Sequence, residues 1–186
     1  KSFKMENNNR RVVITGMGIW SCLGTTLDEV KESLFNGKSG IIFSPERKEM
    51  GFESGLTASV KKPELKGLVD RAHRVFMPEE AQYAYMSTVD ALKMAKLDED
   101  YIEKHDIGLL FGNDSSADAV VKSVDTMREK KSTRLVGSGA IFQSMNSTVT
   151  MNLGSHFTLR GINMTVRAAR ASGSHAMGLG AGLSKR

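Results

Sequence analysis

The segment INMTVRAARASGSHAMG, residues 162–178, has the pattern of a site for covalent catalysis. Its apolar, β-branched beginning predicts a buried strand, the small residues after it predict a tight turn, and the remainder predicts a helix. Enzymes often carry a nucleophile in such a turn. Arg170 stands where that nucleophile would be expected, so the first question is whether this chain performs chemistry.

The serine and histidine residues of the chain do not form a recognisable catalytic or metal-binding pattern. SGSHAMG, residues 172–178, departs from the G-x-S-x-G pattern of hydrolases. Ser172 is therefore expected to cap the helix, and His175 is expected to pack or hydrogen-bond within it. The remaining histidines are far apart and lack metal-ligand spacing, so no metal site is expected: they are His73, His105 and His156.

A second glycine-rich turn, at residues 16–24, also invites a functional interpretation. A dinucleotide-binding fingerprint that begins with Gly16 and Gly18 requires a third glycine at position 21, which is Ser21. The glycines are therefore interpreted as shaping a tight turn. Cys22 lies in this turn, and because no cation or histidine is placed near it by the sequence, a packed structural cysteine is favoured over a reactive thiol.

Alternating strands and helices must position these residues. Apolar runs predict strands at 11–20, 106–114 and 161–169, and a short strand near 56–60. Capping residues and helical spacing predict helices that are listed here by range: 25–37, 78–97, 115–131, 141–153 and 172–186. The last helix consists of small residues and is expected to lie deep in the fold.

This order of elements predicts an α/β fold with a mainly parallel sheet, because apolar strands that alternate with helices are typical of sheets covered on both faces. Three or four strands make a small sheet, and the chain ends as its last helix forms. The pattern therefore resembles half of a larger architecture.

Composition limits the class of protein further. The chain has 186 residues with 40% hydrophobic and 25% charged residues, as in an ordinary globular protein. The formal net charge of +5 is interpreted either as favouring an acidic partner over a basic one or as a solvated basic surface only. Aromatic residues make up only 6% of the chain and do not interleave with the basic clusters, so nucleic acid is not an expected partner.

Cysteine content and the amino-terminal sequence indicate a compartment. A single cysteine cannot form a disulfide within the chain, which is typical of a reducing environment. No apolar run approaches the roughly 20 residues of a membrane span, so no membrane is expected. Residues 1–9 are polar, lack a signal core, and are expected to be a disordered leader, with Met5 as a natural start. We expect a soluble, cytoplasmic protein.

Four stretches together resemble the amino-terminal half of a β-ketoacyl-acyl carrier protein synthase of the elongating type I/II kind. They are RVVITGMGIWSCLG, FNGKSGI, GSGAIFQSMNSTVTMNLG and GINMTVRAARASGSHAMGLGAGL, with LVDRAHRVFM in addition. The resemblance implies the thiolase-like fold, in which two α/β halves form a five-layer sandwich. Residues 10–186 would then be the amino-terminal thiolase-like domain, and the second half would be absent from this chain.

The resemblance also implies an activity. In this family a cysteine in the elbow between strand and helix accepts an acyl group from an acyl carrier protein thioester. A malonyl thioester then loses carbon dioxide and attacks the acyl-enzyme, and two histidines of the second half assist. The helix dipole and backbone amides of the elbow favour the thiolate and the oxyanion. No cofactor is implied, and the expected partners are acyl carrier protein and a second copy in a homodimer.

This sequence departs from the family pattern at the elbow. Arg170 occupies the position of the cysteine, and Arg167 occupies a position where a small residue is usual. A guanidinium stays protonated and has no free lone pair for attack, so acylation cannot proceed at position 170. Each arginine, if buried, requires an anion or a route to water. The regions that would carry the catalytic histidines lie beyond residue 186.

Other site residues follow from the resemblance alone. Ser115 falls where family members line the acyl pocket, and Phe142 lies in a segment that forms this pocket and the dimer interface. Arg71 and Arg74 lie in a stretch whose basic residues contact the carrier protein in the family. Ala72 occupies a position there that is often basic, which weakens this assignment.

Three interpretations therefore stay open. The chain belongs to a 3-oxoacyl-acyl carrier protein synthase of fatty-acid or polyketide elongation, whose working form has cysteine at position 170 and a second half. Alternatively, it is a non-catalytic partner similar to the chain-length factors. Thirdly, it does not fold alone, because half of a thiolase fold exposes a large apolar face. We favour the first interpretation and expect this chain as written to be inactive by itself.

Overall fold

The computed structural model describes residues 11–184, in which the chain forms two compact units. One unit contains residues 16–98, and the other combines residues 11–15 with residues 99–184. The expected leader, residues 1–9, lies outside the described residues. The division matters for function because the elbow and the basic stretch around Arg71 belong to different units.

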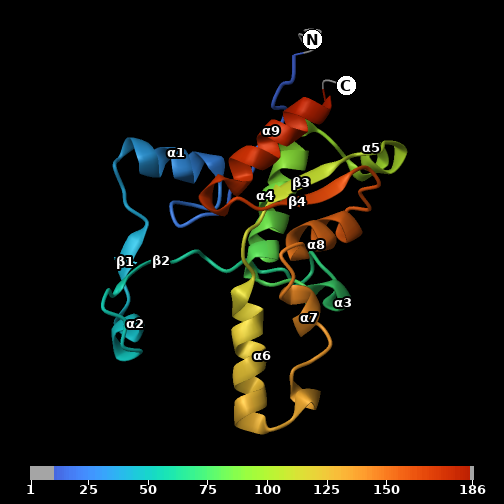
Figure 1. Cartoon of the computed structure of the whole chain (residues 1–186). Coiled ribbons are helices and arrows are strands. Elements are labelled where there is room, and N and C mark those ends of the chain that lie inside the picture. Colours follow the sequence, from blue (N-terminus) through green and yellow to red (C-terminus); the bar gives the residue numbers. More distant parts are fainter. Residues whose placement is uncertain (1–10, 185–186) are drawn as a thin grey trace, which may run out of the picture. The chain divides into compact units, whose positions relative to one another are not determined.

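The unit of residues 16–98 consists mainly of helices with one small hairpin (Figure 1). Its elements are α1 (Leu27–Phe35), β1 (Ile41–Phe43), α2 (Pro45–Glu49), β2 (Leu56–Ala58), α3 (Arg71–Arg74) and α4 (Glu79–Ala95). Strands β1 and β2 pair antiparallel, with Ile41 opposite Ala58 and Phe43 opposite Leu56. The short strand expected near residues 56–60 is therefore confirmed.

Helix α1 forms where its capping residues predict it. The Thr26 side chain accepts a hydrogen bond from the Glu29 backbone N–H, and Glu29 Oε2 accepts from the Thr25 backbone N–H at 2.7 Å. These bonds satisfy amide groups that have no partner inside the helix. The Thr25 backbone N–H also holds the pKa of Glu29 below its usual value. Local sequence alone is therefore enough to start this helix.

The glycines of the TGMG turn allow the backbone to lie against α4. A Cβ atom at Gly16 would collide with the Ala91 carbonyl group, and one at Gly18 would collide with the Ser87 carbonyl group. The Met17 backbone N–H also contacts Met94 Sδ at 3.3 Å. Gly16 and Gly18 therefore serve close packing on a helix. The tight turn expected in this segment lies further along, where the Ser21 and Gly24 backbones bond each other.

The other unit contains the elements around the elbow. They are α5 (Glu99–Lys104), β3 (Leu109–Gly112), α6 (Ala117–Lys130), η1 (Thr133–Leu135), α7 (Ala140–Gln143), α8 (Thr148–His156), β4 (Asn163–Val166), η2 (Ala169–Ala171) and α9 (Ser172–Ser184). Strands β3 and β4 lie side by side and parallel, from Leu109 opposite Asn163 to Gly112 opposite Val166 (Figure 1). The expected α/β organisation with parallel strands is thus present.

Helices α8 and α9 pack on opposite faces of the β3–β4 pair. Asn163 and Thr165 share one face, where their side chains bond Thr150 of α8. On the other face, Gly112 of β3 touches the first turn of α9. Val149 and Leu153 of α8 are fully buried, so the core of this unit lies between α8 and the strands.

Two predicted elements are wrong in their extent. The segment 11–20 is not a strand in the described structure, and Val13 and Ile14 are 64% and 76% exposed. Its apolar residues have no sheet neighbour to pair with among residues 11–184, and strand propensity alone does not hold a strand. The helix expected at 141–153 is split into α7 and α8, and between them the Asn146 carbonyl oxygen accepts from the Asn113 side chain.

The small-residue helix α9 also differs from its expectation. Only Ser172 and Ala176 of α9 are buried, whereas Met177 is 68% exposed. The side of α9 that faces β3 and β4 is covered, and the expectation that the whole helix lies deep is wrong for this chain. Two strands form a surface too narrow to cover more than one side of a helix.

Gly112→Ala tests the contact that places α9 on the sheet. A Cβ atom at position 112 would lie 2.6 Å from the Ser172 carbonyl oxygen, so the α9 backbone would have to move. We expect the substitution to lower the free energy of unfolding, measured with urea, by about 1–3 kcal/mol. Gly178→Ala is the matched control, because nothing lies within 4 Å of its added methyl group. An equal loss in both variants would contradict the assignment.

Candidate functional site

The predicted elbow between strand and helix exists, although the strand ends at Val166 and not at residue 169, and Ser172 closes the elbow. After β4 ends at Val166, the chain makes the short 3-10 turn η2 and enters α9 at Ser172. The Ser172 hydroxyl donates to the Ala169 carbonyl oxygen at 2.7 Å and accepts from the Ala168 backbone N–H at 2.9 Å. This buried hydroxyl is therefore occupied by the turn, and Ser172 links the elbow to the helix in addition to starting it.

Ala169 holds the elbow in a conformation that is unfavourable for most residues. Its φ angle is +47°, in the left-handed region, which costs a residue with a Cβ atom about 1–2 kcal/mol. The hydrogen bond from Ser172 to its carbonyl oxygen stabilises this conformation. Backbone strain of this kind is common at functional sites, and here it lies next to position 170.

Arg170 projects from this elbow into solvent. The residue is exposed, and within residues 11–184 it forms no ion pair. It lies just before the amino end of α9, where a cation is unfavourable with the helix dipole, but water screens that interaction at an exposed position. The structure therefore accommodates Arg170 without an anion, and the elbow retains its shape without a nucleophile.

Arg167 is held differently, by groups at the ends of two other segments. Its Nε lies 3.8 Å from Asp114 Oδ1. With the amide oxygen of Asn146 turned toward the guanidinium, that oxygen accepts from Nη1 at 2.7 Å, from Nε at 3.0 Å and from Nη2 at 3.1 Å. We call Asn113, Asp114, Asn146 and Arg167 the polar clamp.

Asn113 joins the polar clamp to the strands. Its backbone N–H donates to the Val166 carbonyl oxygen at 3.1 Å, which continues the parallel ladder by one residue. Its side-chain amide donates to the Asn146 carbonyl oxygen at 2.8 Å, between α7 and α8. The sequence interpretation did not identify these asparagines. The sequence signal that could have identified them is the polar pair directly after the apolar run of β3. Because parallel strands end at the same edge of a sheet, such a pair is expected to lie beside the end of the neighbouring strand.

The two residues assigned to the acyl pocket lie near different parts of this unit. Ser115 is exposed, directly after Asp114 of the polar clamp and before α6. Phe142 lies in α7, which packs against α6, and is 37% exposed. Both are accessible to solvent. Their role in binding an acyl chain stays a prediction.

Helix α3, in the other unit, presents the two arginines assigned to carrier-protein docking. Asp70 caps this helix by accepting from the His73 backbone N–H at 2.9 Å, and its second oxygen pairs with His73 Nδ1. Arg71 is exposed, whereas Arg74 is half-buried and its Nε is buried without an acceptor. The two arginines therefore have different surroundings, although they lie on one short helix.

The other candidate groups have structural surroundings. Cys22 is half-buried, and its Sγ would lie 2.6 Å from a Cβ atom at Gly40, so it packs closely against that backbone. His175 was expected to pack or hydrogen-bond within α9. Its side chain is exposed, so the expectation that it packs there is wrong. Among residues 11–184, no three histidine, cysteine or acidic side chains are grouped so that they could hold a metal ion. No helix in the same range is long and apolar enough to cross a membrane.

Comparison with known proteins identifies this arrangement. Residues 9–182 match the family model of the β-ketoacyl synthase amino-terminal domain. The chain therefore belongs to the β-ketoacyl synthase family, and the thiolase-like fold predicted from its sequence is confirmed.

Individual relatives agree with the family. The chain is 35% identical over 170 residues to 3-oxoacyl-[acyl-carrier-protein] synthase 1 of Haemophilus influenzae. The matched region covers 91% of this chain and 42% of that protein. A β-ketoacyl synthase from Burkholderia phymatum superposes with a TM-score of 0.76 at 28% identity, covering 93% of this chain and 43% of that one.

A third similar structure is that of a ketosynthase in complex with a type II polyketide acyl-carrier protein. It superposes with a TM-score of 0.72 at 19% identity, covering 93% of this chain and 41% of that chain, and supports the fold. The chain thus spans less than half the length of the relatives that it matches.

Substitutions in the polar clamp should separate its two contacts with Arg167. Three hydrogen-bond contacts reach the Asn146 oxygen, so we expect Asn146→Ala to lower the free energy of unfolding by about 1–2 kcal/mol. Asp114→Asn should cost less than about 1 kcal/mol, because that pair is long and solvent-exposed. Urea unfolding measures both, and in the Arg167→Ser background the Asn146→Ala cost should shrink. A larger cost for Asp114→Asn would contradict this ranking.

The cap of α3 should depend on pH. Hydrogen bonds from the His73 backbone and side chain lower the pKa of Asp70 below its ordinary value of 3.8. A lowered folded-state pKa contributes stability above the unfolded-state value, and this contribution is lost as pH falls through the folded-state value. We therefore expect NMR titration to place the Asp70 pKa below 3.8. Asp70→Asn keeps a capping side chain and should remove this part of the pH dependence of unfolding; an unchanged profile would contradict it.

Proposed function

We propose that this chain is the amino-terminal part of a 3-oxoacyl-acyl carrier protein synthase. The whole protein would condense an acyl thioester with malonyl-acyl carrier protein and release carbon dioxide. The observation that carries the proposal is the elbow itself. Strand β4 leads through the strained Ala169 into α9, the Ser172 hydroxyl bonds hold the turn, and the chain belongs to this family. A nucleophile at position 170 would lie at the amino end of a 13-residue helix.

The proposal assigns roles to the remaining candidate residues. Ser115 and Phe142 would line the acyl pocket, and both are accessible in the structure. Arg71 and Arg74 would contact the acidic carrier protein, since both are cations on one short helix. Ile141 and Phe142 expose apolar surface on α7, which supports the further proposal of a homodimer that buries this surface.

This exact chain would not form an acyl-enzyme. Arg170 has no nucleophilic lone pair, and Cys22 lies in the other unit, in a packed turn against Gly40. The arginine also contributes little to the fold, since it is exposed and has no ion pair within residues 11–184. Loss of the nucleophile is therefore compatible with retention of the elbow.

A non-catalytic partner subunit is the second candidate, and Arg170 is the observation that favours it. A subunit that only shapes the acyl pocket of a synthase requires the fold and the dimer surface but no cysteine. Copurification from the source organism separates the candidates: a stable complex with a second, cysteine-containing synthase supports a partner subunit. A self-associating chain whose gene encodes cysteine at position 170 supports the enzyme.

Arg170→Cys tests whether the elbow can still activate a nucleophile. At the amino end of α9 an exposed thiol should have a lowered pKa, so we expect it to react with iodoacetamide about tenfold faster than Cys22. The Cys22→Ser background isolates the introduced thiol, and mass spectrometry of the alkylated peptides measures both rates. Equal or slower reaction at position 170 would contradict an elbow competent for catalysis.

The unaltered chain provides the complementary test. Incubation with radiolabelled acyl-acyl carrier protein should leave both position 170 and Cys22 without label, since neither offers an accessible, activated nucleophile. Stable label on either residue would refute the proposal that this chain is inactive as written.

A further inference from the structure

Arg167 contacts both segments to which the proposed function assigns the lining of the acyl pocket. Its Nε lies 3.8 Å from Asp114 Oδ1, and Asp114 directly precedes Ser115 of that lining. With the amide oxygen of Asn146 turned toward it, the guanidinium donates to that oxygen at 2.7, 3.0 and 3.1 Å. Asn146 follows α7, the helix that carries Phe142 of the lining. One side chain therefore spans the two segments.

The rest of the polar clamp fixes these two segments to each other. The Asn113 side-chain amide donates to the Asn146 carbonyl oxygen at 2.8 Å and to the Ser116 hydroxyl at 3.3 Å. Asn113 and Asn146 are half-buried, and Ser116 is buried. The groups that hold Arg167 are therefore fixed by the fold, although the guanidinium itself is open to solvent.

Arg167 is also close in the chain to the position of the nucleophile. It is the first residue after β4 and precedes position 170 by three residues, across the beginning of η2. An acyl group attached at position 170 would begin beside this turn. A short acyl group would end there, whereas a longer one that continued between the segments of Ser115 and Phe142 would have to pass the guanidinium.

The charges of the polar clamp make this passage unfavourable for a long apolar chain. The side chain of Arg167 is 59% exposed and that of Asp114 is 46% exposed, so both charged groups are hydrated. Methylene groups that covered them would remove this water without supplying hydrogen bonds. Displacement of the guanidinium would instead break its contacts with Asn146. Both routes oppose a long acyl chain, and neither affects a short one.

We propose that Arg167 is a specificity-determining residue that restricts the acyl group to short chains. The inference rests on the proposed function, because it requires the acyl pocket to lie between the segments of Ser115 and Phe142. The guanidinium acts on the length of the acyl chain and takes no part in bond formation. A small residue at position 167 would leave the passage open.

Acyl transfer to the thiol of Arg170→Cys, in the Cys22→Ser background of the whole chain, tests the inference. The sulfur at position 170 bonds to the carbonyl carbon of an acyl-pantetheine, and the bond from that carbon to the pantetheine sulfur breaks. The proton lost by the attacking thiol ends on the leaving thiol. Butyryl-pantetheine and dodecanoyl-pantetheine are compared, each below the concentration at which it forms micelles. Mass spectrometry measures each rate, which is divided by the rate with glutathione to remove the intrinsic reactivity of the thioester.

We expect the corrected rate of dodecanoyl transfer to be about tenfold lower than that of butyryl transfer. Arg167→Ser should raise the ratio of dodecanoyl to butyryl transfer about tenfold. This ratio is the readout, because loss of a nearby cation changes the fraction of thiolate equally for both thioesters. Asn146→Ala keeps the charge but releases the guanidinium, so the ratio should rise about threefold.

Arg160→Ser is the matched control, since it removes an exposed cation of the same unit before the amino end of β4. It should change the ratio by less than about twofold. Equal corrected rates for the two thioesters, or a ratio that Arg167→Ser changes no more than Arg160→Ser does, would overturn the inference and leave the proposed function intact. If iodoacetamide alkylates position 170 but neither thioester acylates it in any variant, the proposed function fails and the inference fails with it.

Discussion

Parallel pairing of β3 with β4 is the constraint on which the elbow depends. Because the strands run in the same direction, Gly112 and Val166 end at the same edge of the sheet. The residues that follow them, Asn113 and Arg167, are therefore brought into one polar cluster. Gly112 has no side chain, so the first turn of α9 can begin directly above the end of β3. The position of the elbow thus follows from strand direction together with one glycine.

The two arginines of the elbow illustrate two ways in which a protein accommodates a cation. Arg167 extends toward the polar clamp, where a neutral amide oxygen and a more distant carboxylate receive it. Arg170 extends into water, where solvation removes the requirement for a partner. Neither charge is buried, so neither carries the large desolvation penalty of an internal charge. The structure therefore accommodates both guanidinium groups without burying either charge.

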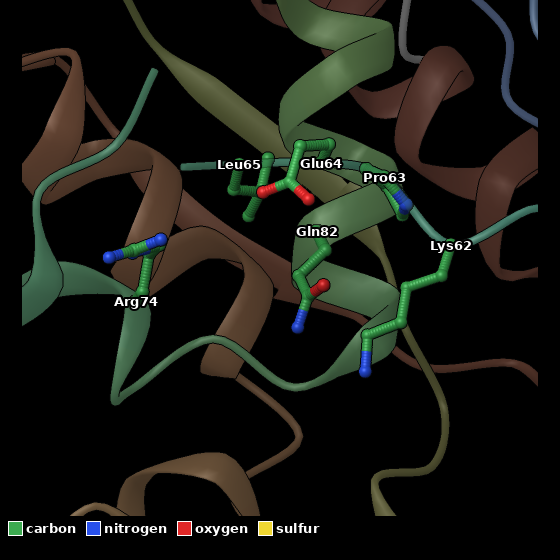
Figure 2. Close-up of a pocket in the computed structure, with 6 residues that line it drawn as sticks. All are labelled: Lys62, Pro63, Glu64, Leu65, Arg74 and Gln82. Carbon is green, nitrogen blue, oxygen red and sulfur yellow. The ribbon is translucent and has the colours of Figure 1, made fainter. Parts of the chain in front are cut away.

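The unit of residues 16–98 depends on local backbone interactions more than on a sheet. Glycines at positions 16 and 18 allow the chain to lie on the α4 backbone, and side-chain caps begin α1 and α3. Helix α3 is only four residues long, so its Asp70 cap supplies much of its hydrogen bonding. This helix turns Arg71 toward solvent and places Arg74 on the wall of a cavity that Gln82 of α4 also lines (Figure 2). Two residues three positions apart in sequence thereby have different surroundings.

Much of the fold could be predicted from sequence because its signals are local. Thr26 and Glu29 mark the start of α1, the small residues after Val166 mark the elbow, and the apolar runs at β3 and β4 mark both strands. The family could be recognised because several such segments occur in a fixed order. The prediction of a strand at 11–20 was wrong since apolar, β-branched residues favour a strand but do not supply its neighbour.

The arrangement of the site was decided by tertiary structure. Asn146 lies between α7 and α8 and bonds both Asn113 and Arg167, which are at least twenty positions away in the chain. The orphaned Nε of Arg74 likewise depends on what surrounds it. The sequence by itself determined the chemical fact that position 170 cannot act as a nucleophile, because that follows from the identity of one side chain. Where each cation lies, and what receives it, was decided only by packing, because charge compensation depends on distance in space.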